Sequence, residues 1–144
     1  AMATAKAAKV PEVLFDWIDS GQRLTRNDPR YSPEAFDRCR RTHLINGPLR
    51  GIREVDLWGA GQAGKPWLRW LQGEGFRVRH VVEVSPKKIG TQIHGVPVIA
   101  DTELPPPDGT PLIIAVGAAG ARKLIEAELT KRNYTPGNDA WFVC

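Results

Sequence analysis

The sequence contains a glycine pattern whose spacing could bind a phosphate: Gly59, Gly61 and Gly64 directly follow the stretch 54–58. In a Rossmann-type crossover, the first glycine of such a turn makes the tight bend, and the second lets the backbone approach a pyrophosphate. The third allows close packing of helix against strand, and the helix that follows offers N–H groups and a positive dipole end. We therefore predict an anion-binding turn here, with Gln62 as a further member of the site.

A second glycine-rich turn follows the continuous apolar run 112–116, which is typical of a parallel strand buried on both faces. This turn contains Gly117 and Gly120. Ligands of open parallel sheets bind at the carboxyl edge, where the strand order reverses, so we expect both turns to lie at one edge of the sheet. Arg122, one turn into the second helix, is a candidate to reach an anionic group there.

Glu83 lies near the end of the second predicted strand, about twenty residues after the first glycine turn, where dinucleotide-binding folds place an acidic residue. Such a carboxylate accepts hydrogen bonds from the ribose hydroxyls of the ligand. In the alternative interpretation, Glu83 faces solvent or pairs with Lys87 or Lys88. Both interpretations stay open at the level of sequence.

The elements that must position these residues alternate between strand and helix from residue 53 onward. Strands are predicted at 54–58, 77–84, 96–99, 112–116 and 140–143, with helices after the two glycine turns. Pro66 is tolerated only in the first turn of a helix, so the first helix is expected to begin at Ala63 or Gly64. The second strand is predicted to alternate regularly, with Val78, His80, Val82 and Val84 on one face and Arg79, Val81 and Glu83 on the other. This order predicts a small Rossmann-like α/β fold with three layers and a parallel sheet of four to five strands.

The preceding residues, 1–52, are expected to form a helical N-terminal arm, and residues 53–144 the Rossmann-like domain. Ser32, Pro33 and Glu34 are typical of a helix start, and that helix is predicted to run to about Ile45. A short apolar helical face is also expected earlier in the arm, formed by Val13, Leu14, Trp17 and Ile18.

Composition and charge exclude several function classes. The formal net charge is +4, and all of it lies in residues 1–53, which hold ten Lys/Arg and six Asp/Glu. Residues 54–144 are neutral, which disfavours nucleic-acid binding by the domain. No apolar run approaches the roughly 20 residues of a membrane helix. Cys39 and Cys144 lie far apart and form no metal-ligand spacing, which favours a reducing, cytoplasmic setting and no metal site.

Several segments taken together resemble a known arrangement. The segment 17–36, WIDSGQRLTRNDPRYSPEAF, is similar to the region that follows the catalytic domain in certain bacterial family 2 glycosyltransferases. The ordered series LWGAGQAGKPW, VVEVSPKKIGTQIHGVPVI and IIAVGAAGARKLI resembles the Rossmann-like domain at the C-terminus of those proteins. The same series is similar to the N-terminal domain of bacterial sugar acyltransferases. Where those relatives often carry paired aspartates, this chain has Glu83 and Ser85.

The resemblance implies that the chain is the C-terminal region of a glycosyltransferase whose catalytic domain belongs to the parent chain. A family 2 catalytic domain needs an Asp-x-Asp metal site for the sugar diphosphate, and no such pair occurs in the sequence. No catalytic residue is therefore predicted here.

Three functions remain open. The first is an accessory domain that binds a nucleotide or nucleotide sugar, or that docks and regulates the attached transferase. The second is an oxidoreductase-type domain that binds NAD(P), although the Tyr-x-x-x-Lys dyad is absent, since Tyr134 is followed at that distance by Asn138. The third is a structural module, such as a homodimer, with a vestigial site and an exposed aromatic patch of Trp67, Trp70 and Trp141.

Overall fold

A computed structural model describes residues 20–144, so the apolar face expected at Val13, Leu14, Trp17 and Ile18 lies outside the described residues. In chain order the elements are α1 (Leu24–Asn27), the 3-10 turn η1 (Pro29–Tyr31), α2 (Pro33–Asn46), β1 (Glu54–Trp58), α3 (Gly64–Gly73), β2 (Arg77–Glu83), β3 (Gln92–Ile93), β4 (Val96–Ala100), η2 (Asp101–Glu103), β5 (Leu112–Ile114), α4 (Ala121–Lys131) and β6 (Ala140–Phe142).

The described strands form one six-stranded sheet in the order β3-β4-β2-β1-β5-β6. All neighbouring strands are parallel except β3 and β4, which are antiparallel. The prediction of a small Rossmann-like α/β fold is confirmed, but the expected four to five strands were one too few. The additional strand is β3, a two-residue strand at the edge of the sheet.

The edge hairpin β3–β4 was missed because its signal is two residues long. His94 and Gly95 connect the strands and both have positive φ, at 49° and 78°, while Ile93 pairs with Val96. Two-residue hairpin loops favour such left-handed pairs because their twist matches that of the flanking strands. The side chain of Gln72 on α3 donates to the carbonyl of His94 at 3.1 Å, which ties the hairpin to the helix.

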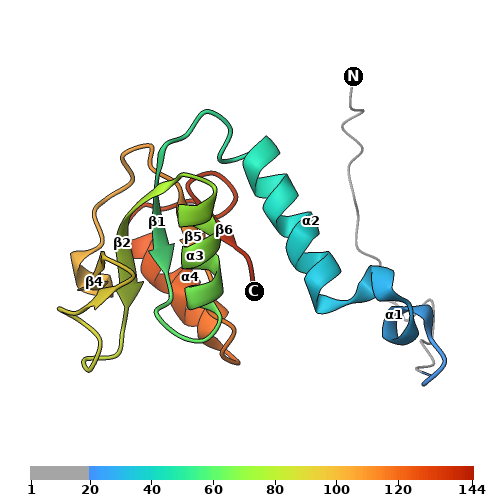
Figure 1. Cartoon of the computed structure of the whole chain (residues 1–144). Helices are drawn as coiled ribbons and strands as arrows, with labels where there is room; N and C mark the ends of the chain where they lie inside the picture. The colour runs from blue at the N-terminus through green and yellow to red at the C-terminus, as the bar shows by residue number, and fades with distance from the viewer. Residues whose placement is uncertain (1–19) are drawn as a thin grey trace, which may run out of the picture. The chain divides into compact units, whose positions relative to one another are not determined.

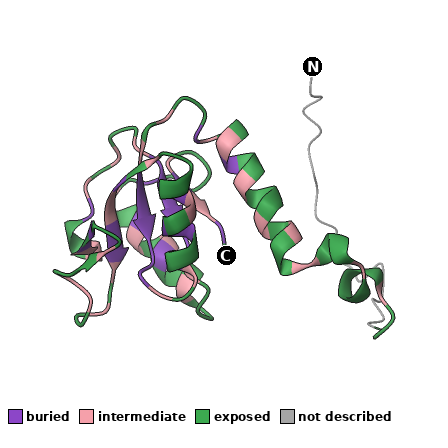
Figure 2. Cartoon of the chain, viewed as in Figure 1, coloured by how far each residue is buried: buried purple, intermediate pink, exposed green. Residues whose placement is uncertain are grey.

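Helices cover both faces of the sheet, which gives three layers (Figure 1). On one face, Trp67, Leu68 and Leu71 of α3 pack with strand residues that include Val55 and Leu57. On the other face, the core is formed by residues of α4 and of the strand faces that point toward it, including Trp58, Val82, Leu112, Ile114, Ile125 and Leu129. The buried residues are concentrated in the strands and on the inner sides of the helices (Figure 2). Because β5 contributes to both cores, its residues are apolar throughout.

The start of α3 confirms the constraint that Pro66 imposes. The helix begins at Gly64, which leaves Pro66 in the first turn. Backbone N–H groups of the first turn have no acceptor within the helix, so proline breaks no hydrogen bond there. The start predicted for α2 is also confirmed, because the hydroxyl of Ser32 accepts from the N–H of Ala35 at 3.1 Å.

Backbone contacts divide the chain into two compact units between Asp37 and Arg38, within α2, rather than at the expected boundary of 52/53. The second unit extends further back because Leu44 and Leu49 are buried in the core beneath α3. In the described part of the first unit, Asp28 accepts from the N–H of Arg30 and pairs with its guanidinium at 2.6 Å, which stabilises η1.

Strand β2 contains an irregularity that overturns the predicted alternation. Val55 pairs with Val78 and Leu57 with Val81, so β2 has one residue more than β1 across the same step. This is a β-bulge, and it places Arg79 and His80 together opposite Asp56. Beyond the bulge the faces are exchanged: Val81 packs on the α3 side and Val82 on the α4 side. The predicted pairing of Val78 with His80 and Val82 on one face was therefore wrong.

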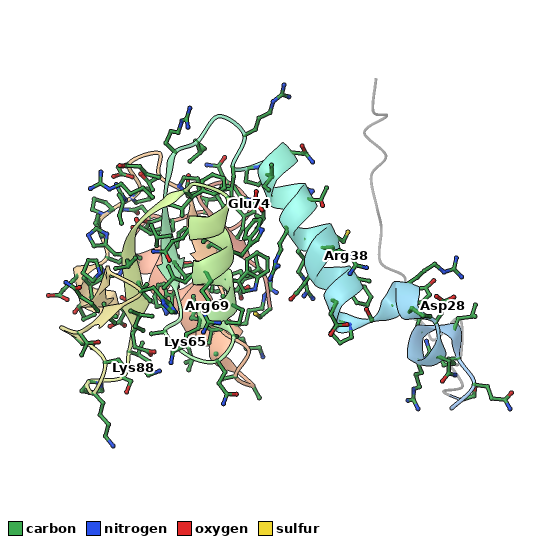
Figure 3. All side chains as sticks on the ribbon, in the orientation of Figure 1. Asp28, Arg38, Lys65, Arg69, Glu74 and Lys88 are labelled. Atoms are coloured by element: carbon green, nitrogen blue, oxygen red, sulfur yellow. The ribbon has the colours of Figure 1, made fainter. Side chains whose placement is uncertain are left out.

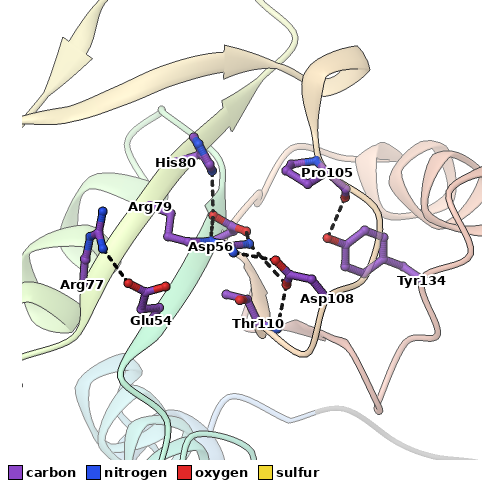
Figure 4. Close-up of polar contacts among 9 residues, drawn as sticks. All are labelled: Glu54, Asp56, Arg77, Arg79, His80, Pro105, Asp108, Thr110 and Tyr134. Carbon is purple, nitrogen blue, oxygen red and sulfur yellow. Dashed lines mark hydrogen bonds and ion pairs between the residues drawn. The ribbon is translucent and has the colours of Figure 1, made fainter.

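The bulge surrounds a fully buried carboxylate, that of Asp56 (Figure 4). Arg79 donates to it at 2.5 Å, and Nδ1 of His80 lies 3.0 Å from its Oδ1. Arg79 also pairs with Asp108 at 2.6 Å, and the Asp56 carboxylate raises the pKa of the Arg79 guanidinium. Hydrogen bonds from Arg79 in turn hold the pKa of Asp108 well below its usual range. Because a buried charge is tolerated only when it is paired, we infer that Asp56 stabilises the bulge.

We predict that Asp56→Asn lowers the free energy of unfolding by about 3 kcal/mol, because it leaves the Arg79 guanidinium, 17% exposed, without its buried counter-charge. Glu54→Gln is the matched control on the same two strands. It removes the exposed ion pair with Arg77 and should change stability by less than about 1 kcal/mol. Urea unfolding of both variants measures the difference, and equal effects would contradict a special role for Asp56.

Candidate functional site

A cavity of about 840 Å³ opens at the carboxyl ends of β1 and β5, in the size range of small-molecule sites. It is lined by both glycine turns, by the end of β2 and by the first turns of α4. The lining residues are Trp58, Gly59, Gly61, Gln62, Ala63, Glu83, Val84, Ala115, Val116, Gly117, Ala118, Ala121, Leu124 and Ile125. The two turns that the sequence predicted to lie at one edge of the sheet therefore face one cavity.

The position of the cavity follows from the strand order. From β1 the chain passes through α3 to β2 on one side, whereas β5 pairs with β1 on its other side. The order thus reverses between β1 and β5. In open α/β sheets this switch point separates the connecting loops and leaves a crevice between them.

Two glycines of the first turn are required by packing. Gly59 has a φ of 123°, and a Cβ there would lie 2.5 Å from the carbonyl oxygen of Ala115. A Cβ on Gly64 would overlap the carbonyl oxygen of Gly59, so only glycine lets α3 begin so close to the turn. Both positions are explained by the approach of loop, strand and helix, with no need for a ligand.

Gly61 and Gly117 differ from these two. Neither has a left-handed φ, and a Cβ on either would meet no atom within 4 Å. Both line the cavity, from opposite turns. Within residues 20–144, the backbone N–H groups of Gly61, Gln62, Gly117 and Ala118 donate to no protein acceptor. The cavity is therefore bordered by backbone N–H groups that can donate hydrogen bonds to a ligand.

Glu83 lines the same cavity, and its carboxylate is already held by neighbouring groups. It accepts from the N–H groups of Val84 and Ser85 at 2.9 and 3.2 Å and pairs with Lys88 at 3.0 Å. Partial burial raises the pKa of the carboxyl, but the hydrogen bonds from Lys88 and the two N–H groups outweigh this effect and lower it overall. Lys88 extends from the loop that leaves β2 (Figure 3). Glu83 is therefore ionised at neutral pH, and its pairing with Lys88 matches one of the two interpretations of the sequence.

Three predicted site residues lie outside the cavity lining: Gly64, whose role in packing is given above, Gly120 and Arg122. Arg122 is directed toward β6, where its guanidinium lies 4.3 Å from the ring centroid of Phe142 and donates to Glu126 at 3.0 Å. Gly120 has a φ of 77° and precedes α4 as its N-cap, which is a conformational reason for glycine. Neither the stacking of Arg122 nor its direction could be derived from helix spacing alone.

Sequence reasoning missed Val84 and Leu124 as cavity residues. Their side chains are 61% and 75% exposed, and both also line a second hollow of about 290 Å³ that shares Trp58 and Ile125 with the first. The two hollows therefore adjoin at these four residues. The signal for Val84 was hidden by the bulge, which shifts the face of every residue that follows it in β2.

The proposed aromatic patch does not form as expected. Trp67 is buried in the α3-side core, and Trp70 packs edge-on against it with ring centroids 5.2 Å apart. The guanidinium of Arg41 lies over both rings, at 5.3 and 5.4 Å, and the indole N–H of Trp70 donates to Glu74 at 3.1 Å. The two tryptophans of α3 therefore pack against Arg41 of α2. Trp67 is buried and is not part of an exposed surface.

The charge of the cavity is unusual for a phosphate site. Among its lining residues Glu83 is the one charged side chain, and no Lys or Arg lines it. Lys65 follows Gly64 in the chain but is exposed on α3 and lies outside the lining (Figure 3). Any anion in the cavity would therefore be held by backbone N–H groups and the dipole of α3.

The described residues contain no group of three or more His, Cys, Asp or Glu side chains placed to hold a metal ion. None of the helices within residues 20–144 combines the length and the apolar character that a membrane span requires.

Comparison with known proteins gives similarity to solved structures alone. No protein-family model matches the chain, and no curated protein matches it. Among solved structures it is similar to the crystal structure of RSP, a Rex-family repressor, with 15% identity and a TM-score of 0.47 over 70% of this chain and 52% of that one. It is similar to RSP in complex with beta-NADH at 16% identity and a TM-score of 0.48, over 70% and 50% of the two chains. The chain spans about half the length of these proteins. The sheet order and the parallel strand pairs of the chain itself define its Rossmann-like α/β fold.

Proposed function

We propose that the domain is a non-catalytic nucleotide-binding module whose cavity holds the pyrophosphate of a nucleoside diphosphate ester, such as a dinucleotide or a nucleotide sugar. The observation that carries this proposal is the pair Gly61 and Gly117. Neither glycine is required by packing or backbone conformation, and both border the cavity at the switch point of the sheet.

The donors fit one pyrophosphate. Residues before α3 and residues of the second turn both line the cavity, and the helix dipole adds a partial positive charge at Gln62 and Ala63. A pyrophosphate diester carries two negative charges. Terminal triphosphates carry about twice that charge and would lack a cationic side chain among the lining residues.

The diol of a ribose would complete the site at Glu83. Its carboxylate retains acceptor capacity beside the bonds from Lys88 and the two backbone N–H groups, because two oxygens offer about four acceptor positions. Hydroxyl groups can donate to these positions, whereas a 2′-phosphate would meet a like charge. The proposal therefore favours NAD-type ligands and nucleotide sugars over NADP.

We further propose that the module is an accessory region of a glycosyltransferase. The segments that carry the resemblance, 57–67, 81–99 and 113–125, supply nearly the whole cavity lining, which supports a shared binding role. A cavity without acid–base pairs or a metal cluster among the described residues suits binding or regulation. Cloning and sequencing of the gene upstream tests this proposal: a family 2 catalytic domain with an Asp-x-Asp motif is expected, and an unrelated upstream domain would contradict it.

We predict that Gly61→Ala and Gly117→Ala leave the fold intact but weaken ligand binding at least about tenfold, or about 1.4 kcal/mol, because each methyl group fills the space that the phosphate must share. Stability should stay the same or rise by about 0.4–1 kcal/mol, since alanine restricts the unfolded chain. Thermal shift with NAD, ADP-ribose and UDP-glucose measures the ligand effect, which reaches about 2.7 kcal/mol at 100 times Kd.

Two glycines in α3 serve as controls for this experiment. Gly73→Ala lies at the far end of the helix in open space, so it should leave binding unchanged while stability stays the same or rises by about 0.4–1 kcal/mol, as in the cavity variants. Gly64→Ala should unfold or strongly destabilise the domain even without ligand, because its Cβ overlaps Gly59. Unchanged affinity in both cavity variants would refute the site.

A further inference from the structure

We propose that this chain binds the surface of anionic membranes through a cationic face on the α3 side of the sheet. The face comprises the second half of α2, the turn that follows it, and the exposed side of α3. Its exposed cations are Arg38, Arg50, Arg53, Lys65 and Arg69. The proposal does not depend on the nucleotide cavity, which is lined by none of these residues.

The charge of the folded unit differs from the neutral charge of residues 54–144, because the compact unit begins at Arg38. Residues 38–53 add five arginines and no Asp or Glu, so the unit carries a net charge of +5. These residues lie on the same side of the sheet as α3, since Leu44 and Leu49 pack in the core beneath that helix. The basic excess therefore belongs to a folded surface rather than to a separate arm.

The cations of this face lack acidic partners. Within residues 20–144, none of the five forms an ion pair. Arg69 donates instead to the imidazole Nε2 of His94 at 3.3 Å. On α4, by contrast, Lys131 and Arg132 both pair with Glu128. The positive field of the cationic face is therefore not cancelled by neighbouring side chains, and it attracts a surface of opposite charge.

Two of these cations, Lys65 and Arg69, lie one turn apart on the exposed side of α3 (Figure 3). Like charges at this spacing slightly destabilise a helix, so the fold gains nothing from the pair. A carboxylate at the end of the helix, that of Glu74, accepts the indole N–H of Trp70 at 3.1 Å. A partner of negative charge would offset the repulsion between the two cations.

The first unit, taken by itself, contributes exposed apolar side chains. Leu24, Tyr31 and Phe36 are 65%, 40% and 48% exposed, and the ring centroids of Tyr31 and Phe36 lie 6.5 Å apart. Segments that lie on membrane surfaces combine Lys or Arg with Phe and Leu. A nucleic-acid duplex binds mainly through its phosphates and gains little from exposed aliphatic side chains. The apolar side chains therefore favour a membrane over a duplex as the anionic partner.

The strength of such binding follows from the number of cations. Each Lys or Arg close to an anionic lipid surface strengthens binding about fivefold, and clusters of four to eight are typical of lipid-binding surfaces. The five cations of the face fall in this range. Binding of this kind is reversible, depends on salt and needs no membrane-spanning helix.

The test is sedimentation of the whole chain with lipid vesicles. Vesicles of phosphatidylcholine alone are compared with vesicles that also contain phosphatidylglycerol, at about 0.1 M and about 1 M NaCl, where the Debye length falls from about 10 Å to about 3 Å. Binding to the anionic vesicles is expected to be at least about tenfold tighter than to the neutral ones at the lower salt. It should fall at least about tenfold at the higher salt.

A pair of double variants tests the face itself. Lys65→Gln with Arg69→Gln should weaken binding to the anionic vesicles at least about tenfold, because both cations leave the face. The matched control, Lys123→Gln with Lys131→Gln, removes the same net charge from α4 and should weaken binding less than about threefold. All four side chains are exposed, so both variants should keep the fold, which thermal unfolding verifies.

Three outcomes would overturn the proposal. An equal loss of binding in the α4 variant would mean that net charge alone is responsible. Binding to a short DNA duplex as tight as to the anionic vesicles, at equal phosphate concentration, would assign the face to nucleic acid. Absence of binding to anionic vesicles at the lower salt would leave the face without its partner. None of these results affects the nucleotide cavity, which Gly61→Ala tests separately.

Discussion

The buried carboxylate of Asp56 is the constraint on which the geometry of the site depends. It draws Arg79 and His80 to one face of the sheet, and this requires one extra residue in β2. Every residue beyond the bulge therefore faces opposite to a regular strand. Val82 packs beneath α4, and Val84 lines the cavity together with Leu124 and Ile125. Without the bulge, regular alternation would place Glu83 on the α4 side and Val84 on the α3 side. An ion cluster outside the cavity lining thus determines which side chains border the cavity.

The glycines at the cavity fall into two groups, one required by backbone packing and one that only borders the cavity. Gly59 and Gly64 allow strand, turn and helix to approach closely, and these contacts bring the first turn of α3 beside β5. Gly61 and Gly117 serve no such contact, and within residues 20–144 their backbone N–H groups donate to no protein acceptor at the cavity. Because the lining contains no basic side chain, the binding of an anion would depend on these N–H groups and on the dipole of α3.

The periodicity and turn signals of the sequence were sufficient to predict the order of elements, the start of α3 and the meeting of the two glycine turns. Those features depend on local rules, such as the missing N–H of Pro66 and the capping hydroxyl of Ser32. The bulge could not be predicted, because the alternating pattern of β2 fits a regular strand equally well. The direction of the Arg122 side chain could not be predicted either, because it depends on contact with Phe142, which is distant in the sequence. Strand β3 was missed because it is only two residues long, whereas the placement of Val84 and Leu124 was missed because it depends on long-range pairing.

The central claim is that the space between the two glycine turns holds a nucleotide, and the most direct test is a titration of the ¹⁵N-labelled protein with ADP-ribose, followed by amide chemical shifts. The account predicts saturable shifts at Gly61, Gln62, Gly117 and Ala118, whose N–H groups border the cavity, with little change at the distant Gly73 and Gly109. Saturable shifts confined to another surface, or no shifts at millimolar ligand, would contradict it.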